Sequence, residues 1–289
     1  MKIIKNFFEF ISIISLFCIF KLVGLKNASR LGDILGRSIG PFFRSKKITK
    51  QNIRTGLGNL NEKEENKIIK SMWSNIGRTF AEYVFLKDFK FNKVNHMKII
   101  GKNFLDLIKK DNKPVIFYSA HFANFELMAM ELDKSGIKCA AIYRPLNNFF
   151  LNPLMEYFRM KYICPTQIPK GRIGMREIIK RVKEGYSIAL MVDQRVGEGP
   201  RAAFFNKPAH TTTIPAQIAL KYDCKLVPIF LERMEESNFE MTIYEPYKFQ
   251  KTGNDEEDTK NITLKINQTI EKIIIKNPGQ WIWSHNRWK

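Results

Sequence analysis

Short apolar runs alternate with stretches of helical periodicity over most of the chain beyond residue 112. Continuous apolar runs predict buried strands at residues 115–119, 138–143, 187–192 and 225–230. Apolar positions that recur every three or four residues predict helices at residues 124–134, 148–161, 172–184 and 213–221. This order predicts an α/β fold with a mixed, largely parallel central sheet flanked by helices. Residues 239–244 predict a further strand at the edge of the sheet.

Helical periodicity also appears before and after this region. Asn61 precedes three glutamates and an apolar stripe over residues 68–84, which predicts a capped helix that packs against the main body. Residues 253–258 (GNDEED) are interpreted as a polar loop, and residues 259–276 as a helix with isoleucines on one face.

The first 26 residues are strongly apolar and aromatic, with lysines at positions 2, 5, 21 and 26. The uncharged part between Glu9 and Lys21 is shorter than the roughly 20 residues of a membrane span. The flanking apolar residues restore that length and leave the charges near the ends, where lysine side chains can reach the membrane surface. We expect a membrane anchor or interfacial helix over residues 1–26 and one domain over residues 27–289. A cleaved signal peptide and a buried core helix are the alternatives.

A glycine-rich segment at residues 32–40 and a basic run at residues 44–54 follow the apolar stretch. The basic run indicates either attraction to anionic lipid headgroups or an ordinary solvated helix face. Positive charge beside the apolar stretch favours a domain on the cytoplasmic side.

The formal net charge is +20. Nucleic acid, an anionic membrane surface and an acidic carrier or substrate are partners that suit such a charge. A general bias of the sequence toward lysine is the alternative explanation for much of this charge. The aromatic residues fall in apolar runs rather than among lysines, so no nucleic-acid partner is expected. The four cysteines include no CxxC pair, and no histidine spacing suits a metal, so we expect neither a metal nor a cofactor.

The most informative polar residues are His121 and Glu126, at the joint between a predicted strand and a predicted helix. On one continuous helix, residues five apart diverge by about 140°. If His121 instead ends the strand and Glu126 begins the helix, the two side chains can converge. A neutral histidine can then take a proton from a hydroxyl while Glu126 holds its other nitrogen, an arrangement that suits acyl transfer to an alcohol. A cap of the helix is the structural alternative for Glu126.

Two further polar residues, Arg144 and Asp193, also follow predicted strand ends. In a parallel α/β sheet, functional groups gather beyond the carboxyl ends of the strands. We expect Asp193 to hold Arg195 or Arg172 in place.

These residues belong to an ordered set of blocks. The set comprises the HxxxxE block 121–126, Tyr-Arg-Pro at 143–145, Gly-Arg at 171–172 with Val-Asp-Gln-Arg at 192–195, residues 204–213 (FFNKPAHTTT) and the tail 280–288 (QWIWSHNRW). In these blocks and in its apolar N-terminus, the chain resembles the bacterial lipid A biosynthesis acyltransferases, the lauroyl/myristoyl transferases. A lone HxxxxE block is weak evidence, whereas five blocks in order are strong evidence.

The resemblance implies a glycerolipid-acyltransferase-like fold and an O-acyltransferase at the cytoplasmic side of the cell inner membrane. The implied donor is a fatty acyl thioester on acyl carrier protein, or acyl-CoA. The implied acceptor is a hydroxyl of a phosphorylated glycolipid, a lipid A precursor, although a lysophospholipid or another glycolipid suits the same chemistry. His121 and Glu126 would be catalytic.

Arg144, Arg172, Asp193 and Arg195 would bind substrate, with the arginines as ligands for phosphate groups or the oxyanion. For the arginines, surface charge is the structural alternative. The tryptophans of the tail and His285 are expected to be packing or interfacial residues.

Overall fold

A seven-stranded sheet in the order β1-β9-β8-β2-β5-β3-β4 forms the centre of the molecule, in a computed structural model that describes residues 2–197 and 199–289. Its strands are β1 (Met97–Ile100), β2 (Val115–Ser119), β3 (Cys139–Tyr143), β4 (Thr166–Pro169), β5 (Ser187–Met191), β8 (Lys225–Arg233) and β9 (Phe239–Ile243). Only the β8–β9 pairing is antiparallel. The predicted mixed, largely parallel α/β sheet is therefore confirmed.

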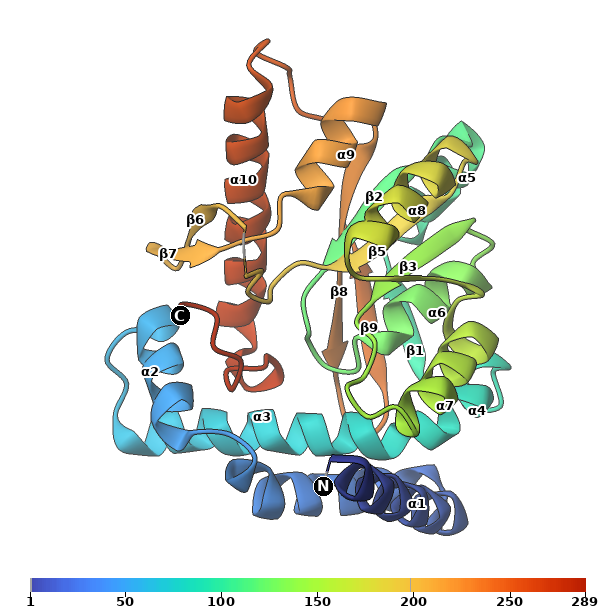
Figure 1. The fold of residues 1–289 in the computed structure, drawn as a ribbon, viewed down its shortest axis with the longest axis vertical. Coiled ribbons are helices and arrows are strands. Elements are labelled where there is room, and N and C mark those ends of the chain that lie inside the picture. Colours follow the sequence, from blue (N-terminus) through green and yellow to red (C-terminus); the bar gives the residue numbers. More distant parts are fainter. Residues whose placement is uncertain (1, 198) are drawn as a thin grey trace.

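Helices flank this sheet, and α9 and α10 lie together on one side of it (Figure 1). The α-helices are α1 (Lys2–Ile39), α2 (Lys46–Leu57), α3 (Glu62–Glu82), α4 (Leu86–Lys90), α5 (Lys102–Asp111), α6 (Glu126–Lys134), α7 (Leu151–Phe158), α8 (Arg172–Lys183), α9 (Ile214–Tyr222) and α10 (Asp255–Lys276). A π-helical turn, Arg159–Ile163, continues α7, and 3₁₀ turns occur at Gly40–Phe42, Tyr83–Phe85 and Pro278–Gln280. A separate hairpin joins β6 (Arg201–Phe204) to β7 (Lys207–His210).

The strand at residues 239–243, β9, was predicted at the edge of the sheet but is an interior strand. β9 lies between β8 and β1, and β1 forms the edge because Met97–Ile100 pairs in parallel with β9. Strands β1, β4, β6 and β7 are not predicted by the sequence pattern, and each is four residues long. Strands this short carry too few alternating positions to show a pattern, and distant neighbours decide their pairing.

The acidic stretch that was interpreted as a loop forms the first turn of α10. The side chain of Asn254 accepts hydrogen bonds from the backbone N–H groups of Glu256 and Glu257, at 3.2 Å each. Four acidic residues follow this cap, where the positive end of the helix dipole stabilises them. The predicted start of α3 is confirmed, because Asn61 and Glu64 form a complete capping box.

The apolar N-terminus and the glycine-rich segment form two successive helical stretches of α1, which meet at a kink. Gly24 interrupts the helical geometry there with φ 78°. Farther on, Gly32 and Gly36 of α1 lie against Gly77 of α3, and a Cβ on Gly77 would stand 2.0 Å from the carbonyl oxygen of Gly32. The glycines therefore permit a close helix crossing rather than forming a loop. In Figure 1, α3 runs across the lower end of the molecule and α1 lies beneath it.

Candidate active site

His121 and Asp193 lie side by side because β2 and β5 are adjacent parallel strands. Ser119 of β2 is in register with Met191 of β5. His121 and Asp193 each lie two residues beyond these positions, so they also face each other. The His121 ring nitrogen Nδ1 lies 2.7 Å from Asp193 Oδ1, and the backbone N–H of His121 donates to Asp193 Oδ2 at 3.0 Å. With Nδ1–H donated to a carboxylate, Nε2 carries the lone pair of a base.

Asp193 is buried and receives a third hydrogen bond, from Trp281 Nε1 to Oδ2 at 2.7 Å. Burial alone would raise the pKa of Asp193. The charge of His121, together with these hydrogen bonds, outweighs it and lowers the pKa of Asp193 to about 2. Asp193 is thus a carboxylate that holds His121, and the expectation that it holds Arg195 or Arg172 is wrong.

Glu126 begins α6, as the sequence predicted, but its carboxylate pairs with Arg159 instead of His121. Arg159 Nη2 donates to Glu126 Oε1 at 2.5 Å, and Nε donates to the same oxygen at 3.2 Å. Burial lowers the pKa of Arg159, and the charge of Glu126 more than reverses this effect, so the pKa is raised overall. The predicted hydrogen bond between His121 and Glu126 is wrong, because the ring is already held by Asp193.

A cavity of about 210 Å³ connects these groups, with His121, Glu126 and Arg159 on its wall. The rest of the wall is mainly apolar and includes Phe125, Met128, Ala129, Ile142, Leu190, Met191 and Ile214. Phe125 packs edge-on against the His121 ring with centroids 4.6 Å apart. His121 Nε2 forms no hydrogen bond within residues 2–197 and 199–289. The site therefore presents a free base to an apolar cavity.

Of the predicted basic residues, Arg144 lines this cavity together with Lys170. Burial, with a contribution from the charge of Arg144, lowers the pKa of Lys170. Arg172 lies exposed on the first turn of α8 and is not part of the cavity wall. The backbone N–H of Arg195 donates to His285 Nε2 at 2.9 Å.

Arg159 and Trp281 belong to the site but were not predicted as site residues. Trp281 and Trp283 are 1% and 0% exposed, so these two tryptophans are packing residues rather than interfacial ones. Trp281 also pairs with Phe122 in an isolated antiparallel bridge, which brings the end of the chain to the His121 loop. The only sequence signal for Trp281 is that it lies in the tail block, residues 280–288. Nothing about Arg159 distinguished it from the other cations.

Acid should destabilise the fold through His285. Burial lowers the pKa of His285 from 6.5 to about 4, although the charge of Asp193 opposes the shift. Between these values the unfolded chain binds a proton that the folded chain does not, so stability is lost as the pH falls. The loss should total at most about 3 kcal/mol. Thermal midpoints measured between about pH 7 and pH 4 should fall more steeply for the wild type than for His285→Gln, whose amide does not titrate. Parallel curves would contradict this assignment.

A histidine held by a buried carboxylate, beside an apolar cavity at the carboxyl ends of parallel strands, is an arrangement that suits general-base chemistry on an apolar substrate. The whole chain, residues 1–289, matches the family description "Bacterial lipid A biosynthesis acyltransferase", and the protein belongs to that family. It is an O-acyltransferase of lipid A biosynthesis.

The relatives are similar in sequence at low identity. The chain is 23% identical to a lipid A biosynthesis lauroyltransferase of Escherichia coli (strain K12) over 269 residues, which cover 90% of this chain and 84% of the relative. It is also 23% identical to the lipid A biosynthesis palmitoleoyltransferase of the same organism over 265 residues, with the same coverage of both chains. A lipid A biosynthesis acyltransferase of Haemophilus influenzae is 25% identical over 252 residues, 84% of this chain and 76% of the relative.

Proposed function

We propose that the protein transfers a fatty acyl chain from an acyl thioester, carried by acyl carrier protein, to a hydroxyl of a phosphorylated lipid A precursor. The observation that carries this proposal is the His121–Asp193 pair, whose free Nε2 lies on the wall of an apolar cavity. An acyl chain suits the apolar wall, and an acceptor hydroxyl suits a nitrogen base. Two of the relatives named above are a lauroyltransferase and a palmitoleoyltransferase.

The chemistry follows from the two ring nitrogens of His121. Nε2 takes the proton of the acceptor hydroxyl as its oxygen forms a bond to the thioester carbonyl carbon. Asp193 stabilises the resulting imidazolium and keeps the ring in the correct tautomer. As the tetrahedral intermediate collapses, the carbon–sulfur bond breaks and the leaving thiolate accepts the proton from Nε2. Arg144, on the cavity wall, supplies positive charge for the oxyanion or for acceptor phosphate groups.

An acidic carrier protein suits the exposed face of α8. This face presents Arg172, Arg176, Lys180 and Lys183 to solvent, and Ile173 beside them is 81% exposed. α8 begins two residues after Lys170, which lines the cavity. Arg172 would then contact the carrier rather than the acyl chain. Such a basic helix attracts an acidic partner over a distance of about one Debye length.

The protein would attach to the cytoplasmic face of the inner membrane through helix α1, which is long and apolar enough to cross a membrane. One face of α1 packs on the domain, since Phe17 packs against Phe80 and Phe7 against Phe150. Its outer face leaves large apolar side chains exposed, among them Ile3, Ile4, Phe8, Ile19 and Leu22. A helix that packs along the domain and exposes an apolar outer face suits a position in the plane of the membrane surface.

The proposal is tested with the full-length protein and labelled acyl thioesters on carrier protein and on coenzyme A, each offered with a panel of acceptors. Acceptors should include a phosphorylated hydroxyacyl glucosamine disaccharide and a lysophospholipid. The wild type should acylate the disaccharide from the carrier-bound donor, and His121→Ala should stay folded but lose transfer. Full activity of His121→Ala would exclude the mechanism, and transfer to the lysophospholipid alone would exclude the acceptor.

A further inference from the structure

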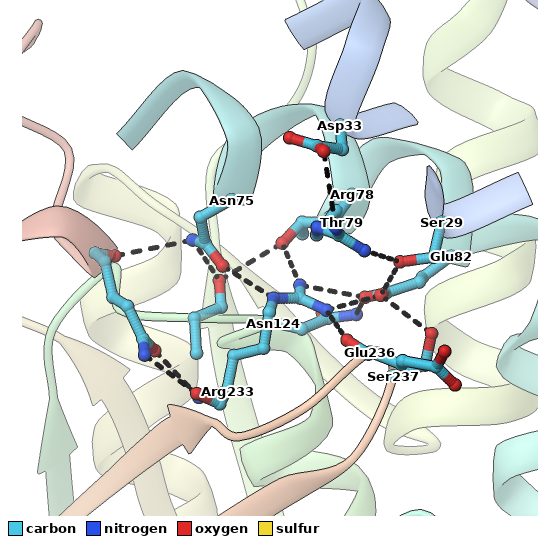
Figure 2. Close-up of polar contacts among 12 residues, drawn as sticks. Ser29, Asp33, Asn75, Arg78, Thr79, Glu82, Asn124, Arg233, Glu236 and Ser237 are labelled. Atoms are coloured by element: carbon cyan, nitrogen blue, oxygen red, sulfur yellow. Dashed lines mark hydrogen bonds and ion pairs between the residues drawn. The ribbon is translucent and has the colours of Figure 1, made fainter. Parts of the chain in front are cut away.

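A buried polar cluster lies where α1, α3 and the β8–β9 connection meet the loop between His121 and Glu126 (Figure 2). At its centre is Glu82, which is 0% exposed. Its Oε1 accepts hydrogen bonds from Ser29 at 2.9 Å and Ser237 at 3.2 Å, and its Oε2 accepts one from Asn124 at 3.0 Å. Arg233 donates to both oxygens. One carboxylate therefore binds four side chains from three separate parts of the chain.

The loop that the cluster holds is strained. Ala123 has φ 49°, in the left-handed region that a residue with a Cβ rarely adopts. Its carbonyl oxygen accepts hydrogen bonds from Asn75 at 3.1 Å and Thr79 at 3.2 Å, both on α3. Such a conformation persists only where the surroundings enforce it. Here α3 and Glu82 enforce it two and three residues after His121.

Stability alone does not account for this cluster. Burying an ion pair such as Glu82–Arg233 removes both charges from water, and their mutual attraction often does not offset that desolvation free energy. Apolar residues of similar size often give the same stability. What distinguishes the cluster is that its hydrogen bonds orient the side chains that hold the His121 loop. Arg233 Nε donates to Asn75 Oδ1 at 2.9 Å, so the residue that holds Ala123 is itself oriented. The arrangement directs donors at one loop, and that loop carries the base.

The cluster also reaches α1. Ser29 of α1 is fully buried and donates to Glu82, while Arg78 donates to Ser29 Oγ at 3.1 Å and pairs with Asp33 of α1. A single carboxylate, Glu82, thus lies between the stretch of α1 that follows Gly24 and Asn124 of the loop after His121 (Figure 2).

We propose that Glu82 is a positioning residue for acyl transfer, and that through Ser29 and Asn124 it makes the geometry of the His121 loop depend on the seating of α1. This deepens the proposed function and rests on it. A chain whose α1 is displaced would lose the Ser29 hydrogen bond. Glu82 would then be held by Arg233, Ser237 and Asn124 alone, and a shift of its carboxylate would let the strained loop relax. Transfer would then be fastest when α1 is docked at a lipid surface, where the acceptor also resides.

The experiment compares full-length variants as folded protein, with kcat and KM measured separately. Asn124→Ala removes the bond between Glu82 and the loop and leaves the ion pair, whereas Glu82→Gln changes both. Each should lower kcat by about 10- to 100-fold, as expected for a misplacement of about 1 Å, and leave KM within about twofold. Glu131→Gln is the matched control, because Glu131 is also a buried glutamate but pairs with His96 and Lys134 instead of the His121 loop. It should keep the wild-type kcat per folded molecule.

The link to α1 is measured as the ratio of activity with acceptor in anionic phospholipid vesicles to activity with acceptor in detergent. Ser29→Ala should lower this ratio at least about threefold, whereas Ser12→Ala, at an exposed serine of the same helix, should not. Equal ratios for the two serine variants would overturn the dependence on α1. A normal kcat for folded Asn124→Ala would overturn the positioning role. Both results require an active wild type, so failure of the proposed function itself is recognised separately by its inactivity.

Discussion

Asp193→Asn is expected to lower kcat for acyl transfer by about 10³- to 10⁴-fold, the size of effect seen when the carboxylate of a catalytic triad becomes an amide. Asparagine keeps the shape of the side chain, but its NH₂ group can donate to His121 Nδ1 and leave the proton on Nε2. The base would then present a hydrogen to the acceptor instead of a lone pair. Single-turnover transfer from a labelled acyl thioester measures the loss.

Trp281→Phe is the matched control for this prediction. It removes the hydrogen bond from Trp281 Nε1 to Asp193 Oδ2 and leaves the bond to His121 intact. Its effect on kcat should be much smaller, about tenfold or less, because the tautomer of His121 is preserved. If Asp193→Asn were as active as Trp281→Phe, the carboxylate would not act through His121 and the mechanism proposed here would be wrong.

Arg159→Ala is expected to lower the free energy of unfolding by about 3–5 kcal/mol, because it leaves the charge of Glu126 without a partner in a largely apolar cavity. The two side chains are 13% and 12% exposed, so water compensates little. Adding Glu126→Gln in the same chain should recover part of the loss, since the uncompensated charge is then gone. Denaturant unfolding of the two single variants and the double variant gives the coupling.

A comparison of Glu126→Gln with Asp193→Asn decides which of the two carboxylates acts on His121. The pH profile of kcat for Glu126→Gln should keep the wild-type position on the pH axis, because Glu126 contacts Arg159 and not the ring. A shifted profile in Glu126→Gln, together with an unshifted one in Asp193→Asn, would restore the original His121–Glu126 pairing. Additive stability effects in the double variant would likewise show that Arg159 and Glu126 do not interact.

The sequence predicted the scaffold of the site well. β2 is predicted and observed at residues 115–119, because five consecutive apolar or small residues in a central strand are all buried. His121, Asp193 and Arg144 were each expected just past a strand end, and each lies there, since a parallel sheet brings such ends to one edge. The pairing among them was predicted wrongly. Sequence proximity favoured Glu126, but a residue 72 positions away fills the place beside the ring.

The reason is physical. Spacing along a chain restricts what lies near a residue only within one helix or one turn, and Glu126 begins a new helix whose first turn faces Arg159. Whether β2 lies beside β5 or beside β3 decides whether Asp193 or Arg144 faces His121, and the order of strands is a property of the whole sheet. The same holds for Glu82, whose four partners come from three other regions of the chain.

By itself, the amino-acid sequence determined the α/β class, the apolar N-terminal helix, the family and the place of His121 just past a strand end, because apolar periodicity and ordered motifs are local properties that survive without the fold. Only the tertiary structure decided that Asp193 holds His121, that Glu126 pairs with Arg159, and that Trp281 and Glu82 support the loop between them. Those contacts depend on the register of parallel strands and on helices crossing at glycines, so residues far apart in sequence meet only after the chain has folded.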